Sequence, residues 1–135
     1  KTRRPRILCG DFNAPQVEYP TGEVVTWAQW IRASGEVVLR KQFRHGDGAR
    51  WDAAERNIMT GLGKFDLLDV YRTLCGWEAQ GFSWYPIRKK IKVQGRRFDH
   101  IFASRSLNVA RCRYLDEARL ASLSDHAPIE ADFSL

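Results

Sequence analysis

The sequence predicts a mixed α+β domain built mainly from antiparallel strands, with two helices. Four strand-like segments lie in its second half, one apolar strand opens the chain, and two stretches between them have apolar residues at helical spacing. The chain has 135 residues, of which 44% are apolar and 12% aromatic. This length and composition are typical of one globular domain, which we assign to residues 1–135.

The first predicted element is a buried strand at residues 6–12, ended by the turn Asn-Ala-Pro. A helix is predicted at residues 26–33, where Thr26 is a candidate N-cap. A second helix is predicted at residues 52–62, with Asp52 as its cap and glycines at its end. Four strands follow, at residues 81–86, 97–103, 109–115 and 127–133.

The three cysteines have no CxxC spacing, so the sequence predicts neither a disulfide framework nor a zinc site. Cys9 and Cys112 lie in strand-like segments and are interpreted as small core residues. This cysteine usage favours a reducing, intracellular compartment, either cytoplasmic or nuclear. The apolar runs are too short to span a membrane.

The chain is basic, with a net charge of +6, and its cations cluster in one segment. Six of the ten residues at 88–97 are basic: Arg88, Lys89, Lys90, Lys92, Arg96 and Arg97. Such a cluster attracts polyanions, of which nucleic acid is the usual one. A solvated hairpin that keeps the protein soluble explains it equally well, so both interpretations remain open.

Short polar groups stand at the edges of three predicted strands. They contain Asp11 with Asn13, Asp99 with His100, and Ser124, Asp125 and His126. Each group alone also occurs in ordinary turns, because Asx turns use the same residue types. Together they supply an imidazole, an amide and carboxylates that can bind a hard cation. These are the groups needed to hydrolyse a phosphate ester with Mg²⁺.

Four segments carry a resemblance: GDFNAP, FSWY, RRFDHIFAS and SDHAPIEADF. In their order and spacing they resemble the C-terminal motifs of the endonuclease/exonuclease/phosphatase superfamily, and most of all those of exonuclease III-type apurinic endonucleases. LLDVYR, which precedes FSWY, is also similar to that branch. The resemblance extends from residue 7 to residue 133, although residues 15–48 match poorly.

The resemblance implies a role for each motif residue. Asp11 would orient or deprotonate the attacking water, and Asn13 would hold Asp11 and hydrogen-bond the phosphate. Asp125 would help to bind Mg²⁺ or Mn²⁺. His126, made cationic by Asp99, would contact a non-bridging phosphate oxygen, where negative charge grows in the transition state.

Four further residues near these motifs have alternative interpretations. Trp84 either packs in the core or stacks on a base or sugar of bound DNA. Phe82 shares its strand face and is interpreted as core. Arg97 either contacts a phosphate or pairs with an acid. His100 follows Asp99, so its side chain should lie on the opposite sheet face and serve packing.

The resemblance covers only part of the superfamily's domain, a two-layered α/β sandwich of about 250 residues made of two similar halves. The chain is similar to the C-terminal half, and none of its glutamates fits the metal ligand that the N-terminal half supplies. We therefore expect the chain alone to bind Mg²⁺ poorly and to be weakly active or inactive. Its inner sheet face should lack cover, which favours the missing half as a partner or self-association.

The first functional hypothesis is a Mg²⁺-dependent DNA endonuclease or exonuclease, of the kind that acts in DNA repair. A second is a phosphatase or phosphodiesterase acting on phosphoinositide, sphingomyelin or a small nucleotide, because the Ser-Asp-His ending is shared among these branches. A third is a non-catalytic polyanion-binding module. The sequence leaves all three open.

Overall fold

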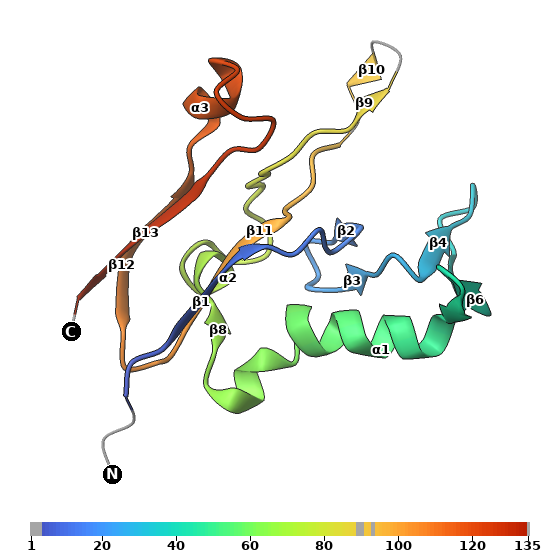
Figure 1. Cartoon of the computed structure of the whole chain (residues 1–135), viewed down its shortest axis with the longest axis horizontal. Helices are drawn as coiled ribbons and strands as arrows, with labels where there is room; N and C mark the ends of the chain where they lie inside the picture. The colour runs from blue at the N-terminus through green and yellow to red at the C-terminus, as the bar shows by residue number, and fades with distance from the viewer. Residues whose placement is uncertain (1–3, 89–90, 93, 135) are drawn as a thin grey trace.

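The computed structural model describes residues 4–88, 91–92 and 94–134. The fold is mixed α+β, and all strand pairs in this part of the chain are antiparallel. At its centre lies a three-stranded sheet in the order β1 (Ile7–Asp11), β11 (Asp99–Ala103) and β8 (Leu68–Asp69). Figure 1 shows β1 and β11 side by side along most of their length.

A long two-stranded ribbon forms the C-terminal part of the fold. Its strands are β12 (Asn108–Tyr114) and β13 (Ile129–Ser134), and the short helix α3 (Asp116–Leu120) lies at their connection (Figure 1). Helix α2 (Val70–Cys75) packs between this ribbon and β11. The apolar cluster that joins these elements consists of Val70, Tyr71, Ile101, Ala103 and Cys112.

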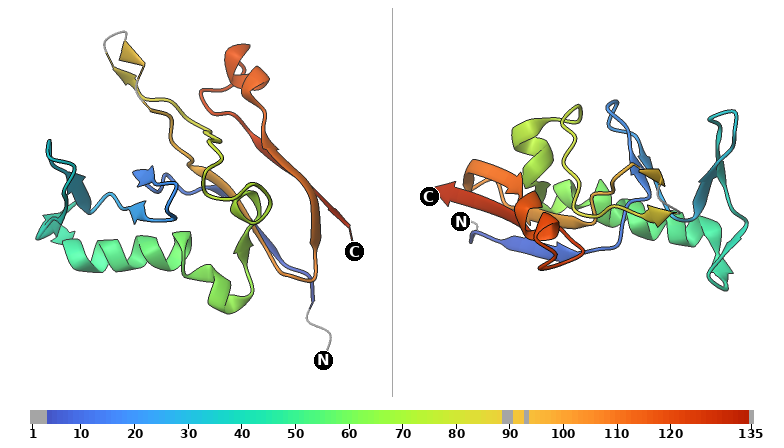
Figure 2. Two further views of the ribbon diagram at one scale, coloured as in Figure 1. Left: turned by 180° about the vertical axis from the view of Figure 1, so that it is seen from behind. Right: turned by 90° about the horizontal axis from the view of Figure 1, so that it is seen from above.

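The central region consists of short hairpins that lead into one long helix. The hairpins pair β2 (Val17–Glu18) with β3 (Val24–Val25), β4 (Gln29–Ile31) with β5 (Val37–Leu39), and β6 (Gln42–Phe43) with β7 (Gly46–Asp47). Helix α1 (Gly48–Met59) follows and is succeeded by the 3₁₀ turn η1 (Leu62–Phe65). The hairpin of β9 (Ile87–Arg88) and β10 (Ile91–Lys92) projects from the far end of β11 (Figure 2).

The helix predicted at residues 26–33 is wrong, because this segment forms a turn and β4. Long-range polar contacts hold the segment in this conformation. The Thr26 hydroxyl donates to Asp52 Oδ1 at 2.7 Å, and the Gln29 side chain accepts a hydrogen bond from Thr26 N at 3.0 Å. The helical spacing of the tryptophans therefore does not reflect a buried helix face, and Trp30 is 44% exposed.

The second predicted helix is confirmed, but it begins four residues earlier, at Gly48. Its N-cap is Asp47, whose carboxylate accepts from Arg50 N at 3.0 Å. The predicted cap, Asp52, instead lies inside α1 and pairs with Arg56 at 3.0 Å. Helices α2 and α3 were not predicted, and only an isolated bridge at Trp84 forms within the strand predicted at residues 81–86.

Strand β1 forms as predicted, but the prediction that it is buried is wrong. All five of its residues are exposed, with Ile7 at 51% and Leu8 at 39%. It is an edge strand of its sheet in the described part of the chain, so no neighbouring strand there pairs with its outer edge. Cys9 is exposed rather than a core residue, whereas Cys112 is buried as predicted. Self-association through an exposed sheet face remains a prediction.

Candidate active site

The pairing of β1 with β11 places two carboxylates together. Asp11 is the last residue of β1 and lies directly opposite Asp99, the first residue of β11. Paired residues of antiparallel strands project to the same face of the sheet. The two acids therefore meet at one end of the sheet, which is where the sequence predicted a site.

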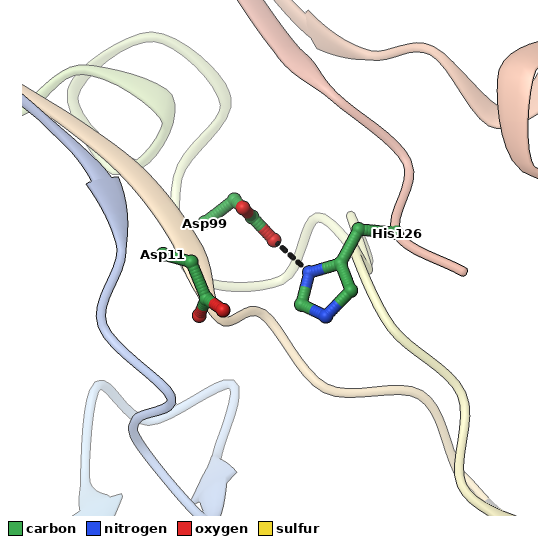
Figure 3. A group of neighbouring side chains, drawn as sticks. All are labelled: Asp11, Asp99 and His126. Carbon is green, nitrogen blue, oxygen red and sulfur yellow. Dashed lines mark hydrogen bonds and ion pairs between the residues drawn. The ribbon is translucent and has the colours of Figure 1, made fainter. Parts of the chain in front are cut away.

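His126 reaches the same place from the other side of the fold. The chain before β13 bridges to Trp84, and Ala127 N donates to Ser83 O at 2.7 Å. His126 Nδ1 then lies 2.6 Å from Asp99 Oδ2 (Figure 3). One ligand atom each from Asp11, Asp99 and His126 lies within 4.8 Å of the other two.

Asn13 holds the Asp11 carboxylate in place. Its backbone N–H donates to Asp11 Oδ1 at 2.8 Å and its side-chain amide to Asp11 Oδ2 at 3.3 Å. Asn13 adopts a positive φ of 51°, a conformation that asparagine tolerates better than most residues. Its carbonyl accepts from Trp27 Nε1 at 2.7 Å. Asp11 is thus oriented while it remains exposed.

The backbone of Asp99 is held by two residues, neither of which was identified from the sequence. The Ser83 hydroxyl oxygen accepts from Phe98 N at 2.9 Å and from Asp99 N at 3.1 Å. Tyr114 donates its hydroxyl to the Asp99 carbonyl at 2.7 Å. Ser83 lies within the FSWY segment, so its position in a motif was a signal, whereas Tyr114 lies in β12 and the sequence gives no sign of its role.

The environment of His126 favours its cationic form. Burial of the ring lowers its pKa, but the hydrogen bond and charge of Asp99, followed by the charges of Asp11 and Asp125, raise the pKa by more. The net effect places the pKa above the ordinary value for histidine. The imidazole therefore keeps its proton to a higher pH than an isolated side chain would.

The donors at this end of the sheet fit a hard divalent cation. Carboxylate oxygens are the ligands that Mg²⁺ and Mn²⁺ prefer. Asp11 supplies one exposed carboxylate, and Asp99 shares its own with His126. Asp125, the metal ligand implied by the resemblance, is exposed and is not part of the three-residue group within 4.8 Å. It adjoins His126 in the chain, so it lies at the border of the site.

A hollow of about 770 Å³ opens beside Asp125, the residue that precedes His126 in the chain. Its other lining residues are Trp27, Trp84, Tyr85, Pro86, Arg96, Arg119, Ser122 and Ser124. Trp84 is half-buried and stacks on Phe98 with ring centroids 5.4 Å apart, yet it also borders the hollow. The packing of Trp84 is therefore confirmed in part, and its stacking on DNA remains a prediction. The Arg96 guanidinium lies 4.7 Å from the centre of the Trp27 ring.

The predicted basic hairpin corresponds to β9 and β10. Arg88 ends β9 and Lys92 ends β10, while Lys89 and Lys90 lie outside the described residues. Figure 1 shows this hairpin and α3 projecting from the same side of the fold. The assignment of the hairpin to nucleic-acid binding remains a prediction.

Arg97 does not belong to this basic surface, and its prediction as a nucleic-acid contact is wrong. It is 3% exposed, and its guanidinium lies between two carboxylates. Arg97 Nη2 donates to Glu18 Oε1 at 2.7 Å and also bonds Asp69 Oδ2. Glu18 is held from its other side by Arg72 at 2.6 Å. The alternative, that Arg97 pairs with an acid, is confirmed.

His100 serves packing, as expected. Its side chain is fully buried, on the opposite face from Asp99. Its Nε2 lies 2.8 Å from the Ala14 carbonyl and its Nδ1 lies 3.5 Å from Asp69 Oδ2. The ring stacks on Phe102 at 5.6 Å.

The buried carboxylates predict a loss of stability in acid. Burial raises the pKa of Glu18 and of Asp69, but hydrogen bonds and charges from Arg97, with Arg72 for Glu18 and His100 for Asp69, lower both pKa values overall. The unfolded chain, with carboxyl pKa values of about 4, then binds more protons in acid than the folded chain. This stabilisation is complete at pH values above the carboxyl pKa of the unfolded chain. It is lost as the pH falls toward the lower pKa values that the two groups have in the folded chain.

We therefore expect the urea midpoint to stay nearly constant from about pH 7 to pH 5.5 and to fall steadily below about pH 4.5. Urea titrations followed by tryptophan fluorescence at several pH values would measure it. A urea midpoint that stays unchanged between about pH 5 and pH 3 would contradict the lowered pKa values of Glu18 and Asp69.

Comparisons of the chain with models of protein families, with curated proteins and with solved structures found no match. No helix in the described part of the chain is long and apolar enough to cross a membrane.

Proposed function

We propose that this chain carries out metal-dependent hydrolysis of phosphodiesters, as a DNA endonuclease or exonuclease of the exonuclease III type. The observation that supports this best is the meeting of Asp11, Asp99 and His126 at one end of the sheet. These residues come from three separate segments of the chain, and all three segments belong to the motifs on which the proposal rests. The oriented Asp11–Asn13 pair and the short His126–Asp99 contact complete the arrangement.

In the proposed mechanism, each residue acts at a definite atom of the phosphodiester or the attacking water. Asp11, exposed and oriented by Asn13, accepts the proton of the attacking water. His126, protonated at both ring nitrogens, donates one N–H to Asp99 and the other to a non-bridging phosphate oxygen. A Mg²⁺ or Mn²⁺ ion held by carboxylates would add Lewis-acid stabilisation of the charge on phosphorus-bound oxygens.

DNA is the proposed substrate because the surroundings of the site suit a polyanion with aromatic bases. The net charge is +6, and the hollow beside Asp125 combines aromatic rings with Arg96 and Arg119. We further propose that the fold is the C-terminal half of the endonuclease/exonuclease/phosphatase sandwich. In that case the exposed strand β1 is where the complementary half adds its strands.

A substrate comparison tests the proposal. Duplex DNA with an abasic site, a phosphoinositide and bis(p-nitrophenyl) phosphate are each incubated with the protein at high enzyme concentration, with Mg²⁺ or with EDTA. We expect slow cleavage of the DNA in Mg²⁺ alone. Phosphoinositide turnover without DNA cleavage would instead favour the lipid phosphodiesterase. Salt-sensitive DNA binding with no metal-dependent cleavage, even when the complementary half is supplied, would favour a polyanion-binding module.

A further inference from the structure

A second cavity borders Asn13. It has a volume of about 180 Å³ and is also bordered by β6 and α1. The lining residues that matter here are Trp27, Phe43, Arg44, Trp51 and Ala54. Pockets that enclose a whole small-molecule ligand usually exceed about 300 Å³. This cavity therefore suits one ring system that belongs to a larger molecule.

The wall of the cavity is aromatic and carries a cation. The Phe43 and Trp51 rings meet edge to face at 5.7 Å, and the Arg44 guanidinium lies 5.3 Å from the first ring and 5.8 Å from the second. Arg44 and His45 form the two-residue turn between β6 and β7, and both have positive φ. Two such residues are typical of a type I′ turn, which fixes the hairpin and hence the position of Arg44.

The segment that supplies Phe43, Arg44 and Trp51 to the cavity is basic. Arg40, Lys41, Arg44 and Arg50 lie within eleven residues, all are exposed, and none forms an ion pair with another residue in the described part of the chain. The acid among them, Asp47, caps helix α1. Exposed cations without acidic partners attract the phosphates of a nucleic-acid strand.

Trp27 connects this cavity with the candidate active site. It borders both the cavity and the hollow beside Asp125, and its Nε1 donates to the carbonyl of Asn13, which orients Asp11, at 2.7 Å. A strand whose phosphate lies between Asp11 and His126 has its next nucleotides close to Trp27. The cavity is thus within reach of a base neighbouring the reacting phosphate.

We propose that this cavity binds one unpaired nucleobase of the substrate strand, stacked on Trp51 and Phe43, while Arg40, Lys41 and Arg50 contact the adjoining phosphates. The proposal rests on the proposed function, since it makes single-stranded DNA beside the cleaved bond the preferred substrate. A paired base cannot enter, because its ring is stacked in the duplex. Removing the aromatic partner of one stacked base typically weakens binding by about tenfold or more.

The test measures binding without cleavage, in EDTA, using a short fluorescently labelled DNA strand with 2-aminopurine as its central base. We expect Trp51→Ala to weaken binding about tenfold. Ala54→Phe, which keeps an exposed helix position but fills the cavity, should weaken it similarly. In the wild type, 2-aminopurine fluorescence should be quenched on binding, and both variants should lose this quenching.

The chain offers matched controls for both variants. Trp30 is 44% exposed, compared with 39% for Trp51, and does not line the cavity. Ala53 precedes Ala54 on α1 and is also exposed, but unlike Ala54 it does not line the cavity. Trp30→Ala and Ala53→Phe should bind within about twofold of the wild type.

Three results would overturn the proposal. They are equal losses in Trp51→Ala and Trp30→Ala, duplex DNA bound as tightly as the single strand, and an RNA strand of the same sequence bound more tightly than DNA. Because no cleavage is measured, the outcome is independent of the proposed hydrolysis. If the substrate comparison showed no metal-dependent cleavage even with the complementary half supplied, loss of binding in Trp51→Ala would still support the base cavity.

Discussion

Replacing Asp11 by asparagine is expected to lower the rate of Mg²⁺-dependent phosphodiester cleavage by about 10²- to 10⁴-fold, the usual contribution of a general base. The change removes the charge but keeps the shape of the side chain. An asparagine oxygen can still accept the hydrogen bond that Asn13 N donates to Asp11 Oδ1 at 2.8 Å. The fold should therefore be unaffected, and the loss should appear in the rate with saturating DNA.

Asp132→Asn is the matched control for this variant. Asp132 lies on β13, its side chain is 57% exposed, and its partner is Arg111 at 2.9 Å. Initial rates on abasic-site DNA, measured for the wild type and both variants, should fall only for Asp11→Asn. Equal rates in all three proteins would remove Asp11 from the mechanism.

Replacing Arg97 by methionine should have the largest effect on stability. Its side chain is 2% exposed, and removing it leaves Glu18 and Asp69 buried. Glu18 then retains the Arg72 guanidinium, whereas Asp69 retains the backbone N–H of Arg72 and a long contact with His100. Breaking a buried ion pair from one side typically costs about 3–5 kcal/mol. Urea unfolding should show a loss of this size in the free energy of unfolding, or a chain that no longer folds.

Arg111→Met is the comparison for this change. Arg111 also contacts two acids, Asp132 and Glu130, but its side chain is 55% exposed, so it should lose only about 0–1 kcal/mol. A destabilisation of Arg97→Met no larger than that of Arg111→Met would mean that the buried network adds little to folding.

The part of the site that the sequence predicted best is the set of polar residues at the ends of strands. GDFN, RRFDHIF and SDH each combine a strand pattern with polar residues at its boundary, and the structure places Asp11, Asp99 and His126 at one end of the sheet. Asp11 and Asp99 meet because each lies at the end of its strand and the two strands pair in a register that places these ends opposite each other. Local sequence patterns were therefore enough to predict this part of the site.

Contacts between distant residues explain what the sequence did not reveal. Thr26 and Gln29 are fixed by Asp52 and Arg56 of α1, which changed a predicted helix into β4. Arg97 stands in a basic run, yet it is buried because Glu18, 79 residues away, faces it. The exposure of β1 likewise depends on what covers its edge, which no local pattern encodes.

The most direct test of the account uses the three histidines of the chain as reporters of a bound metal. Mn²⁺ is paramagnetic and broadens the NMR signals of nearby protons, even when it binds weakly. His126 belongs to the candidate site, His100 is buried on the opposite face of the sheet, and His45 lies in the turn between β6 and β7. Low concentrations of Mn²⁺ should broaden the ring signals of His126 first, and Asp11→Asn should weaken this effect. Equal broadening of His126 and His45, or none at His126, would contradict a metal-assisted site at the end of the β1–β11 sheet.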